Sequence, residues 1–176
     1  MTRPLFDTFL AACRAAMNGP DPMDGVRSAL GALGATPDAA LAEVPAFDGD
    51  DYTLLHQPDL SVFIVRQDPL TAGPPHDHGM TAAIVMLDGV EIHHRYKRDG
   101  EAITPYGTTH LEPGEVLILD GEEVHAIANP DPTPSIGVHV YFGDIVDGAR
   151  TLWDPDTGEA MAFTTADYDR MVVAPG

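Results

Sequence analysis

The segment TAAIVMLDGVEIHHRY at positions 81–96 places an Asp-Gly pair between two runs rich in β-forming residues. Asp-Gly is a strong signal for a tight β-turn, because such turns need residues that tolerate positive φ angles. Similar short runs, separated by turn residues, continue on both sides of this segment. They lie at 52–56, 61–66, 107–111, 115–119, 124–128 and 136–142. Strands at this regular spacing predict an all-β sandwich or barrel.

The chain before this β-rich region has the pattern of helices. The apolar residues that recur there at helical spacing are Phe6, Leu10, Cys13 and Met17. A second helix is expected from a cap at Asp24 to about Leu33, and a short third one from Thr36-Pro37.

We expect one domain over residues 1–176. It consists of helices at 1–45, a β-barrel at 52–150 and a C-terminal extension at 151–176. The extension is expected to hold a short strand near 159–163 and a helix from residue 164 or 165 to 171.

Composition narrows the class of protein. A chain of 176 residues that is 44% hydrophobic can build one core. A formal charge of −19 repels nucleic acids and anionic lipids, so neither is expected as a partner. No apolar run reaches the roughly 20 residues of a membrane helix, and the single cysteine, Cys13, excludes a disulfide framework. We therefore expect a cytoplasmic protein.

The histidines give the first indication of chemistry. His76 and His78 follow a Gly-Pro-Pro turn, and residues two apart in an extended chain point to the same side. Both imidazoles can therefore reach one metal ion. A second segment, 114–125, is a strand, an Asp-Gly turn and a strand that carries a lone histidine, His125. A surface His-x-His pair and a structural strand histidine are the alternatives.

These two segments resemble the two motifs of the cupin superfamily. The family has a His-x-His motif that ends in glycine and a Gly-x5-Pro-x-Gly-x2-His-x3-Asn motif. Here Gly89 closes the first, and the spacing of the second is matched by Gly114, His125 and Asn129. The proline and inner glycine of the second motif are replaced, and position 70, where the first usually begins with glycine, is leucine.

The resemblance implies a double-stranded β-helix, or jelly-roll barrel, with an N-terminal helical segment. It also implies that a metal ion in the mouth of the barrel is bound by His76, His78 and His125. Cupins often pair their edge strands, so a homodimer is one of the oligomeric states that the resemblance leaves open.

The first motif departs from the family where a glutamate ligand usually stands. Ala82 occupies that position, so the expected ligands are three neutral imidazoles. Three nitrogen donors suit Fe(II), copper, nickel or zinc better than magnesium or calcium. With no carboxylate bound, a divalent ion keeps its full charge and can accept a thiolate together with partly reduced oxygen. A bound metal also deprotonates a thiol.

Within the cupins, the three-histidine arrangement resembles the thiol dioxygenases, which act on cysteine, 3-mercaptopropionate or cysteamine. His139 and Tyr141 share one face of a late strand, like that family's Ser-x-His-x-Tyr relay, although position 137 is glycine and Ser135 is not expected to replace the serine. The resemblance implies that Tyr141 positions oxygen or substrate and that His139 orients Tyr141. A core histidine beside a core tyrosine is the alternative.

Arg150 is the candidate for substrate binding. Animal cysteine dioxygenases hold the substrate carboxylate with an arginine early in the barrel, where this chain has Leu54. Bacterial 3-mercaptopropionate dioxygenases carry an arginine soon after the relay tyrosine, at an offset that Arg150 matches. A guanidinium binds a carboxylate through two parallel hydrogen bonds. An exposed Arg150 paired with Asp147 is the alternative.

The sequence, with these resemblances, predicts a mononuclear Fe(II) thiol dioxygenase that uses O2 to convert a small carboxylated thiol to its sulfinate. Two other classes stay open: another three-histidine cupin enzyme, such as a C–C cleaving dioxygenase or an isomerase, and a non-catalytic cupin that binds a metal or ligand.

Glu123 is a candidate partner for a ligand imidazole. Of the adjacent pair His93 and His94, one is expected on the barrel exterior.

Overall fold

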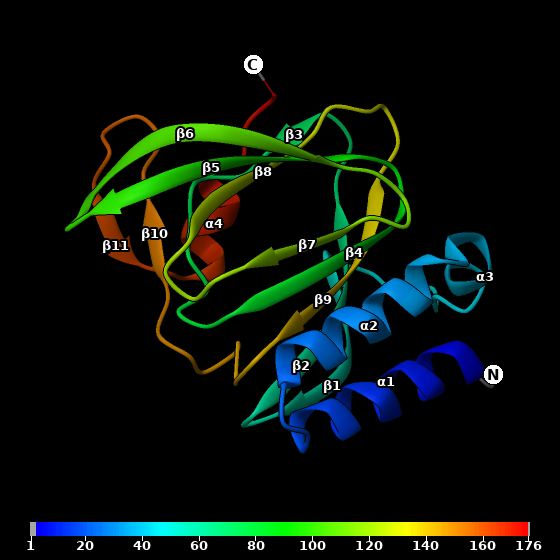
Figure 1. Cartoon of the computed structure of the whole chain (residues 1–176). Coiled ribbons are helices and arrows are strands. Elements are labelled where there is room, and N and C mark those ends of the chain that lie inside the picture. The colour runs from blue at the N-terminus through cyan, green and yellow to red at the C-terminus, as the bar shows by residue number, and fades with distance from the viewer. Residues whose placement is uncertain (1–2, 176) are drawn as a thin grey trace.

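The computed structural model describes residues 3–175, which form an antiparallel β-barrel with helices at both ends of the chain (Figure 1). The elements are α1 (Pro4–Met17), α2 (Pro22–Gly34), α3 (Pro37–Leu41), β1 (Asp51–Gln57), β2 (Leu60–Gln67), β3 (Thr71–Ala72), β4 (Ala82–Asp88), β5 (Glu91–Asp99), β6 (Ala102–Leu111), β7 (Val116–Leu119), β8 (Val124–Asn129), β9 (Ser135–Tyr141), β10 (Thr151–Trp153), β11 (Ala160–Ala162) and α4 (Thr165–Met171). Within the described residues, no helix is long and apolar enough to span a membrane.

Two sheets form the barrel. One has the strand order β1-β2-β9-β4-β7 and the other has the order β3-β8-β5-β6. The Asp-Gly pair at 99–100 closes a hairpin between β5 and β6. The pair at 88–89 does not, because β4 and β5 lie in different sheets and the chain crosses between them there. This arrangement confirms the predicted all-β barrel of the double-stranded β-helix type, with helices at its N-terminal end.

The N-terminal helices cover the outer face of the first sheet (Figure 1). The residues of α2 that are most deeply buried against it are Val26, Leu30 and Leu33. Gly34 ends the helix where the backbone of Gly114 passes, and a Cβ at Gly34 would lie 2.8 Å from that carbonyl oxygen. A glycine is therefore required for this close approach. The N-cap of α2 is Asp21, which accepts a hydrogen bond from the backbone of Asp24, so the predicted cap at Asp24 is wrong.

Strand β4 is buried on both faces. Residues 82–87 are all buried, and alternate side chains of a strand point to opposite sides. Ala83 and Val85 belong to the core beneath the helices, whereas Ala82 and Ile84 belong to the core inside the barrel. This double burial explains why the strand shows a continuous apolar run instead of an alternation.

The C-terminal extension packs against the barrel at the segment that carries His76. Strands β10 and β11 pair with each other, and α4 lies beside them (Figure 1). Leu152 of β10 also bridges to His76, so the extension contacts the segment that carries the first motif. The short strand and last helix were predicted, but β3 and β10, with two and three residues, were not.

Candidate metal centre

Three buried histidines from two distant segments meet inside the barrel. His76 and His78 lie on the segment before β4, and His125 lies in β8. One ring nitrogen of each lies within 4.8 Å of the others, and none of the three residues is more than 6% exposed. Among residues 3–175, no carboxylate or thiol joins this cluster. The structure therefore brings together the three predicted ligands, with donors that are all imidazole nitrogens.

The segment that carries His76 is fixed by backbone hydrogen bonds on both sides. His76 and His125 exchange two of them, with N···O distances of 2.8 and 3.0 Å. On the other side, the backbone N–H of Trp153 in β10 donates to the carbonyl of Pro75 at 2.9 Å. Strands β8 and β10 thus hold the motif between them, so its imidazoles are positioned by the barrel rather than by a free loop.

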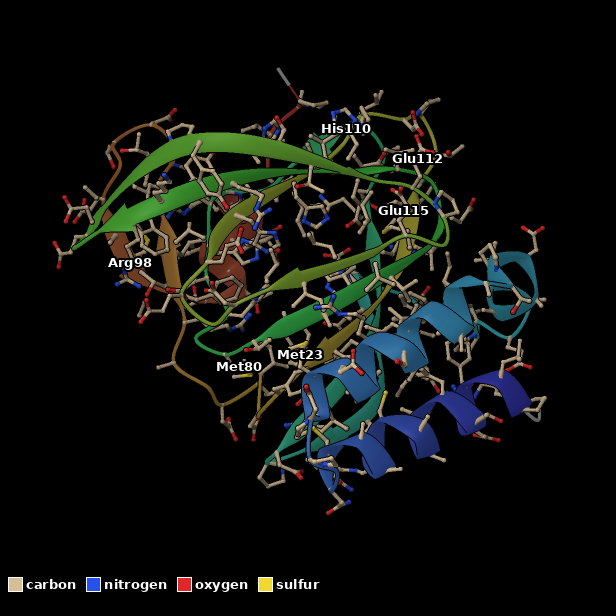
Figure 2. All side chains as sticks on the ribbon, viewed as in Figure 1. Met23, Met80, Arg98, His110, Glu112 and Glu115 are labelled. Atoms are coloured by element: carbon tan, nitrogen blue, oxygen red, sulfur yellow. The ribbon has the colours of Figure 1, made fainter. Side chains whose placement is uncertain are left out.

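Asp77, between the two histidines, points away from them and holds the extension in place. Its carboxylate accepts a hydrogen bond of 2.7 Å from the backbone N–H of Thr151 and pairs with Arg98 at 3.0 Å. Figure 2 shows Arg98 at the end of β5 nearest β10, where its guanidinium lies over the ring of Trp153. Asp77 therefore fixes the start of β10, directly after Arg150.

Hydrogen bonds to the rings indicate which nitrogens are free for a metal. Nδ1 of His76 lies 3.1 Å from the carbonyl oxygen of Pro74 and therefore carries the proton, which leaves Nε2 as the donor atom. Two other buried ring nitrogens, Nε2 of His125 and Nδ1 of His78, have no hydrogen-bond partner. Buried polar atoms without a partner are rare in folded proteins. A divalent transition-metal ion bound by the three imidazoles would provide the missing contacts.

Burial keeps these imidazoles neutral. It lowers the pKa of His76 to about 4, and it holds the pKa of His78 and His125 well below the usual value, with the neighbouring imidazoles adding to the effect. A neutral imidazole has a free lone pair for a metal. The site is therefore in its metal-binding protonation state at neutral pH.

A cavity of about 390 Å³ opens onto the cluster, and His76 and His78 form part of its wall. His139, Tyr141 and Arg150 line the same cavity. Its exposed members are carboxylates and one threonine, namely Asp50, Asp51, Asp68, Thr165 and Asp169. The cavity thus combines a histidine floor, two half-buried arginines, Arg66 and Arg150, and an acidic rim.

His139 and Tyr141 form the pair that the sequence suggested. Nδ1 of His139 lies 3.1 Å from the hydroxyl of Tyr141, and both side chains are buried. Burial lowers the pKa of His139 to about 4 and raises the pKa of Tyr141, so both groups are neutral at pH 7. Nε2 of His139 faces Gly137, and Ser135 bonds to Glu91 instead, so this pair has no serine.

Arg150 lies in the cavity rather than on the outer surface. Its guanidinium carbon stacks 3.8 Å from the centre of the Phe163 ring. Within the described residues, no ion pair joins it to Asp147. Its positive charge helps to lower the pKa of His76 and His78, after the larger effect of burial. Arg150 therefore offers its guanidinium to a molecule in the cavity.

Sequence reasoning missed a second layer behind His125. His93 is fully buried and its Nδ1 lies 3.0 Å from Nδ1 of His125, whereas His94 is exposed. Glu91, two residues earlier on the same inward face of β5, is also fully buried. The sequence did contain a signal for this layer, because a glutamate and a histidine two residues apart on a barrel strand point to the same side and can both face the interior. The candidate Glu123 was wrong as an imidazole partner, because it lies in the turn before β8 and contacts Arg95 and Tyr106.

The chain matches no family model and no curated protein. Among solved structures it resembles a DMSP lyase from Ruegeria pomeroyi, with a TM-score of 0.53 and 17% identity over 88% of this chain and 99% of that one. An uncharacterized protein with a double-stranded β-helix domain from Klebsiella pneumoniae has a TM-score of 0.47 and 23% identity over 62% and 89% of the two chains. A cupin superfamily protein from Desulfitobacterium hafniense has a TM-score of 0.44 and 11% identity over 58% and 86%. The likeness to the Ruegeria pomeroyi structure shows a shared fold.

The metal-free protein is expected to lose stability as the pH falls from about 6.5 to about 4. His76 and His139 have a pKa of about 4 in the fold, because burial disfavours their charged forms. The unfolded chain binds these protons near pH 6.5, so the stabilisation is complete above that pH and is lost below it. Each such histidine changes the free energy of unfolding by up to about 1.4 kcal/mol per pH unit in this window. Urea denaturation of chelator-treated protein between about pH 7.5 and pH 4.5 measures the slope. A free energy of unfolding that stays constant across the window would contradict the assignment.

Proposed function

We propose that this chain is a mononuclear Fe(II) thiol dioxygenase that oxidises a small carboxylated thiol to its sulfinate. In this reaction the S–H group loses its proton, the O–O bond breaks, and both atoms of O2 are bonded to sulfur. The observation that carries the proposal is that one cavity is lined by His76, His78, Tyr141 and Arg150, beside a metal-binding cluster that contains no carboxylate. One small substrate in this cavity could therefore contact a metal bound by the histidines, the hydroxyl of Tyr141 and the guanidinium of Arg150.

Fe(II) bound by His76, His78 and His125 would supply open coordination positions for a thiolate and for O2. The three ligand imidazoles are neutral, so they would leave the positive charge of a bound ion available to stabilise a thiolate. The guanidinium of Arg150 binds the substrate carboxylate and directs the sulfur toward the histidines. Stacking on Phe163 limits the rotation of that guanidinium, so it is oriented before substrate enters.

Tyr141 supplies a hydroxyl that remains protonated, because burial raises its pKa. With its proton on Nδ1, His139 donates to the Tyr141 oxygen across the 3.1 Å contact. The tyrosine then turns its own hydroxyl hydrogen toward the cavity, where it can donate to oxygen or substrate. His139 is thus a positioning residue for Tyr141, and Tyr141 is the group that touches the reactants.

A lyase that acts on a zwitterion is the second candidate. The DMSP lyase from Ruegeria pomeroyi aligns over 99% of its length with this chain. The carboxylates at the cavity rim, together with Arg150 inside it, suit a substrate with a cationic group at one end and a carboxylate at the other. DMSP, a sulfonium with a propionate chain, has this charge pattern.

Oxygen uptake and product analysis separate these candidates. We expect protein loaded anaerobically with Fe(II) to consume one O2 per thiol with 3-mercaptopropionate, cysteine or mercaptosuccinate, and mass spectrometry to find the sulfinate. Cysteamine, which has no carboxylate, is expected to react far more slowly. Dimethyl sulfide released from DMSP without oxygen uptake would support the lyase instead. Iron-loaded protein that turns over none of these compounds would contradict both candidates and favour a different cupin enzyme or a binding protein.

A further inference from the structure

Behind the metal-binding cluster, four buried polar side chains follow one another into the protein. Nδ1 of His125 lies 3.0 Å from Nδ1 of His93, Nε2 of His93 lies 3.2 Å from Oε2 of Glu91, and the hydroxyl of Ser135 donates to Oε1 of Glu91 at 3.0 Å. All four residues are fully buried. They connect β8, β5 and β9, so the chain of contacts is part of the barrel interior.

We propose that His93 and Glu91 are positioning residues for the metal centre. They fix His125 with Nε2 toward the metal ion, and Glu91 supplies a buried negative charge in place of the absent carboxylate ligand. The proposal rests on the metal binding contained in the proposed function and not on the thiol chemistry.

The direction of the hydrogen bonds follows from the ring that binds the metal. If Nε2 of His125 is the donor atom, its proton is on Nδ1 and points to Nδ1 of His93, which must accept. His93 then carries its proton on Nε2, the nitrogen that faces Glu91. These atoms of His93 and Glu91 lie 3.2 Å apart but have no hydrogen-bond partner at the present ring orientation, so a rotation of the ring would let each satisfy the other. Only one placement of the protons makes both contacts favourable. In it, His125 donates to His93 and His93 donates to the carboxylate of Glu91.

Glu91 is suited to carry the charge. Burial alone would raise its pKa, but the contact with His93 and the hydrogen bond from the Ser135 hydroxyl act against burial, and the pKa is lowered. An ionised carboxylate with no exposed surface needs a compensating positive charge nearby. Among the described residues, the side chains placed to pair or hydrogen-bond with it are His93 and Ser135, both neutral in this arrangement. A divalent ion at His125 would supply that charge.

The position of this charge also has a consequence for coordination. Within the described residues no carboxylate joins the cluster, and Ala82, which matches the glutamate ligand of the cupin motif that the sequence resembles, is fully buried. Glu91 acts through two imidazoles, so it compensates part of the metal charge without occupying a coordination position. Contacts of this outer kind typically change metal affinity about 10- to 100-fold. We therefore expect Glu91 to strengthen metal binding while the ion keeps its open positions.

The test is the Co(II) dissociation constant of Glu91→Gln, measured by competition with a chromophoric chelator. Gln keeps the shape and can still bond to Ser135, but it removes the charge. We expect binding about 10- to 100-fold weaker than in the unaltered protein, with a metal-free melting temperature that is unchanged or higher, because a buried charge has been removed. His93→Asn is expected to weaken Co(II) binding to a similar extent, and it replaces Glu91→Gln in the test where that variant does not fold.

His94→Asn is the matched control, since His94 is the exposed neighbour of His93, and its affinity is expected to stay unchanged. A purely structural role predicts the opposite pattern, a lower metal-free melting temperature with Co(II) affinity unchanged. That pattern, or affinity within about twofold of the unaltered protein in both variants, would overturn the proposal. The unaltered protein must bind Co(II) in either case, so its failure to bind would count against the proposed function instead.

Discussion

His125→Ala is expected to abolish metal loading and, with it, oxygen uptake. His125 is fully buried in β8, and the variant removes one of only three donor nitrogens. Metal sites with three or four protein ligands bind with total free energies on the order of 10 kcal/mol, so the loss of one ligand weakens binding on the order of 100- to 1,000-fold. The change also leaves the buried Nδ1 of His93 without its partner. No remaining His, Cys, Asp or Glu among the described residues is placed to take over.

Metal content after dialysis, measured by mass spectrometry, and oxygen uptake with 3-mercaptopropionate are the two measurements. His110→Ala is the control, because His110 lies on β6, as Figure 2 shows, and outside the cluster. It is expected to bind metal as the unaltered protein does. An iron-loaded, active His125→Ala protein would remove the assignment of the centre.

Most of the barrel was predictable because strand periodicity and turn chemistry are local properties of the sequence. The β-rich run before the Asp-Gly pair in the segment 81–96 is β4, at residues 82–88. What a local pattern cannot show is the partner of each strand. The Asp-Gly pair at 88–89 signals a turn, but whether the turn closes a hairpin or crosses between sheets depends on β9 and β7, which pair with β4 from later in the chain. Strands as short as β3 and β10 have no period to detect.

Some residues of the candidate site were also predictable from local sequence, whereas others depend on how the strands pair. The three ligand histidines were predicted from motif spacing, because the family motif records a geometry that one sequence can match. His93 and Glu91 were not predicted, because adjacent histidines on a strand fit either face equally well. The pairing of β5 with β8, in which Arg95 stands opposite His125, decides that His93 faces inward. The position of Arg150 depends on the contacts of Asp77 with β10, which join residues far apart in the sequence.

Arg150→Ala is expected to lower kcat/KM for 3-mercaptopropionate about 30-fold to several thousand-fold. This corresponds to the roughly 2–5 kcal/mol that is lost when one partner of a buried, hydrogen-bonded charge pair is removed. Arg150 is half-buried, lines the cavity and stacks on Phe163, so a carboxylate bound there would be shielded from water. Arg150→Lys keeps the charge but cannot form two parallel hydrogen bonds, so it is expected to recover only part of the loss.

A comparison with cysteamine tests whether Arg150 binds the substrate carboxylate, and not only whether Arg150 is needed for activity. It has a thiol but no carboxylate, so its low kcat/KM is expected to change little in Arg150→Ala. Arg170→Ala, in the exposed part of α4 where Arg170 pairs with Asp167, serves as the control for a lost surface charge. Since Arg150 also acts electrostatically on His76 and His78, a general effect on the metal centre would reduce turnover of both thiols equally. An equal reduction would therefore reject carboxylate binding by Arg150, whereas a reduction confined to carboxylated thiols would identify the end of the cavity at which the substrate is held.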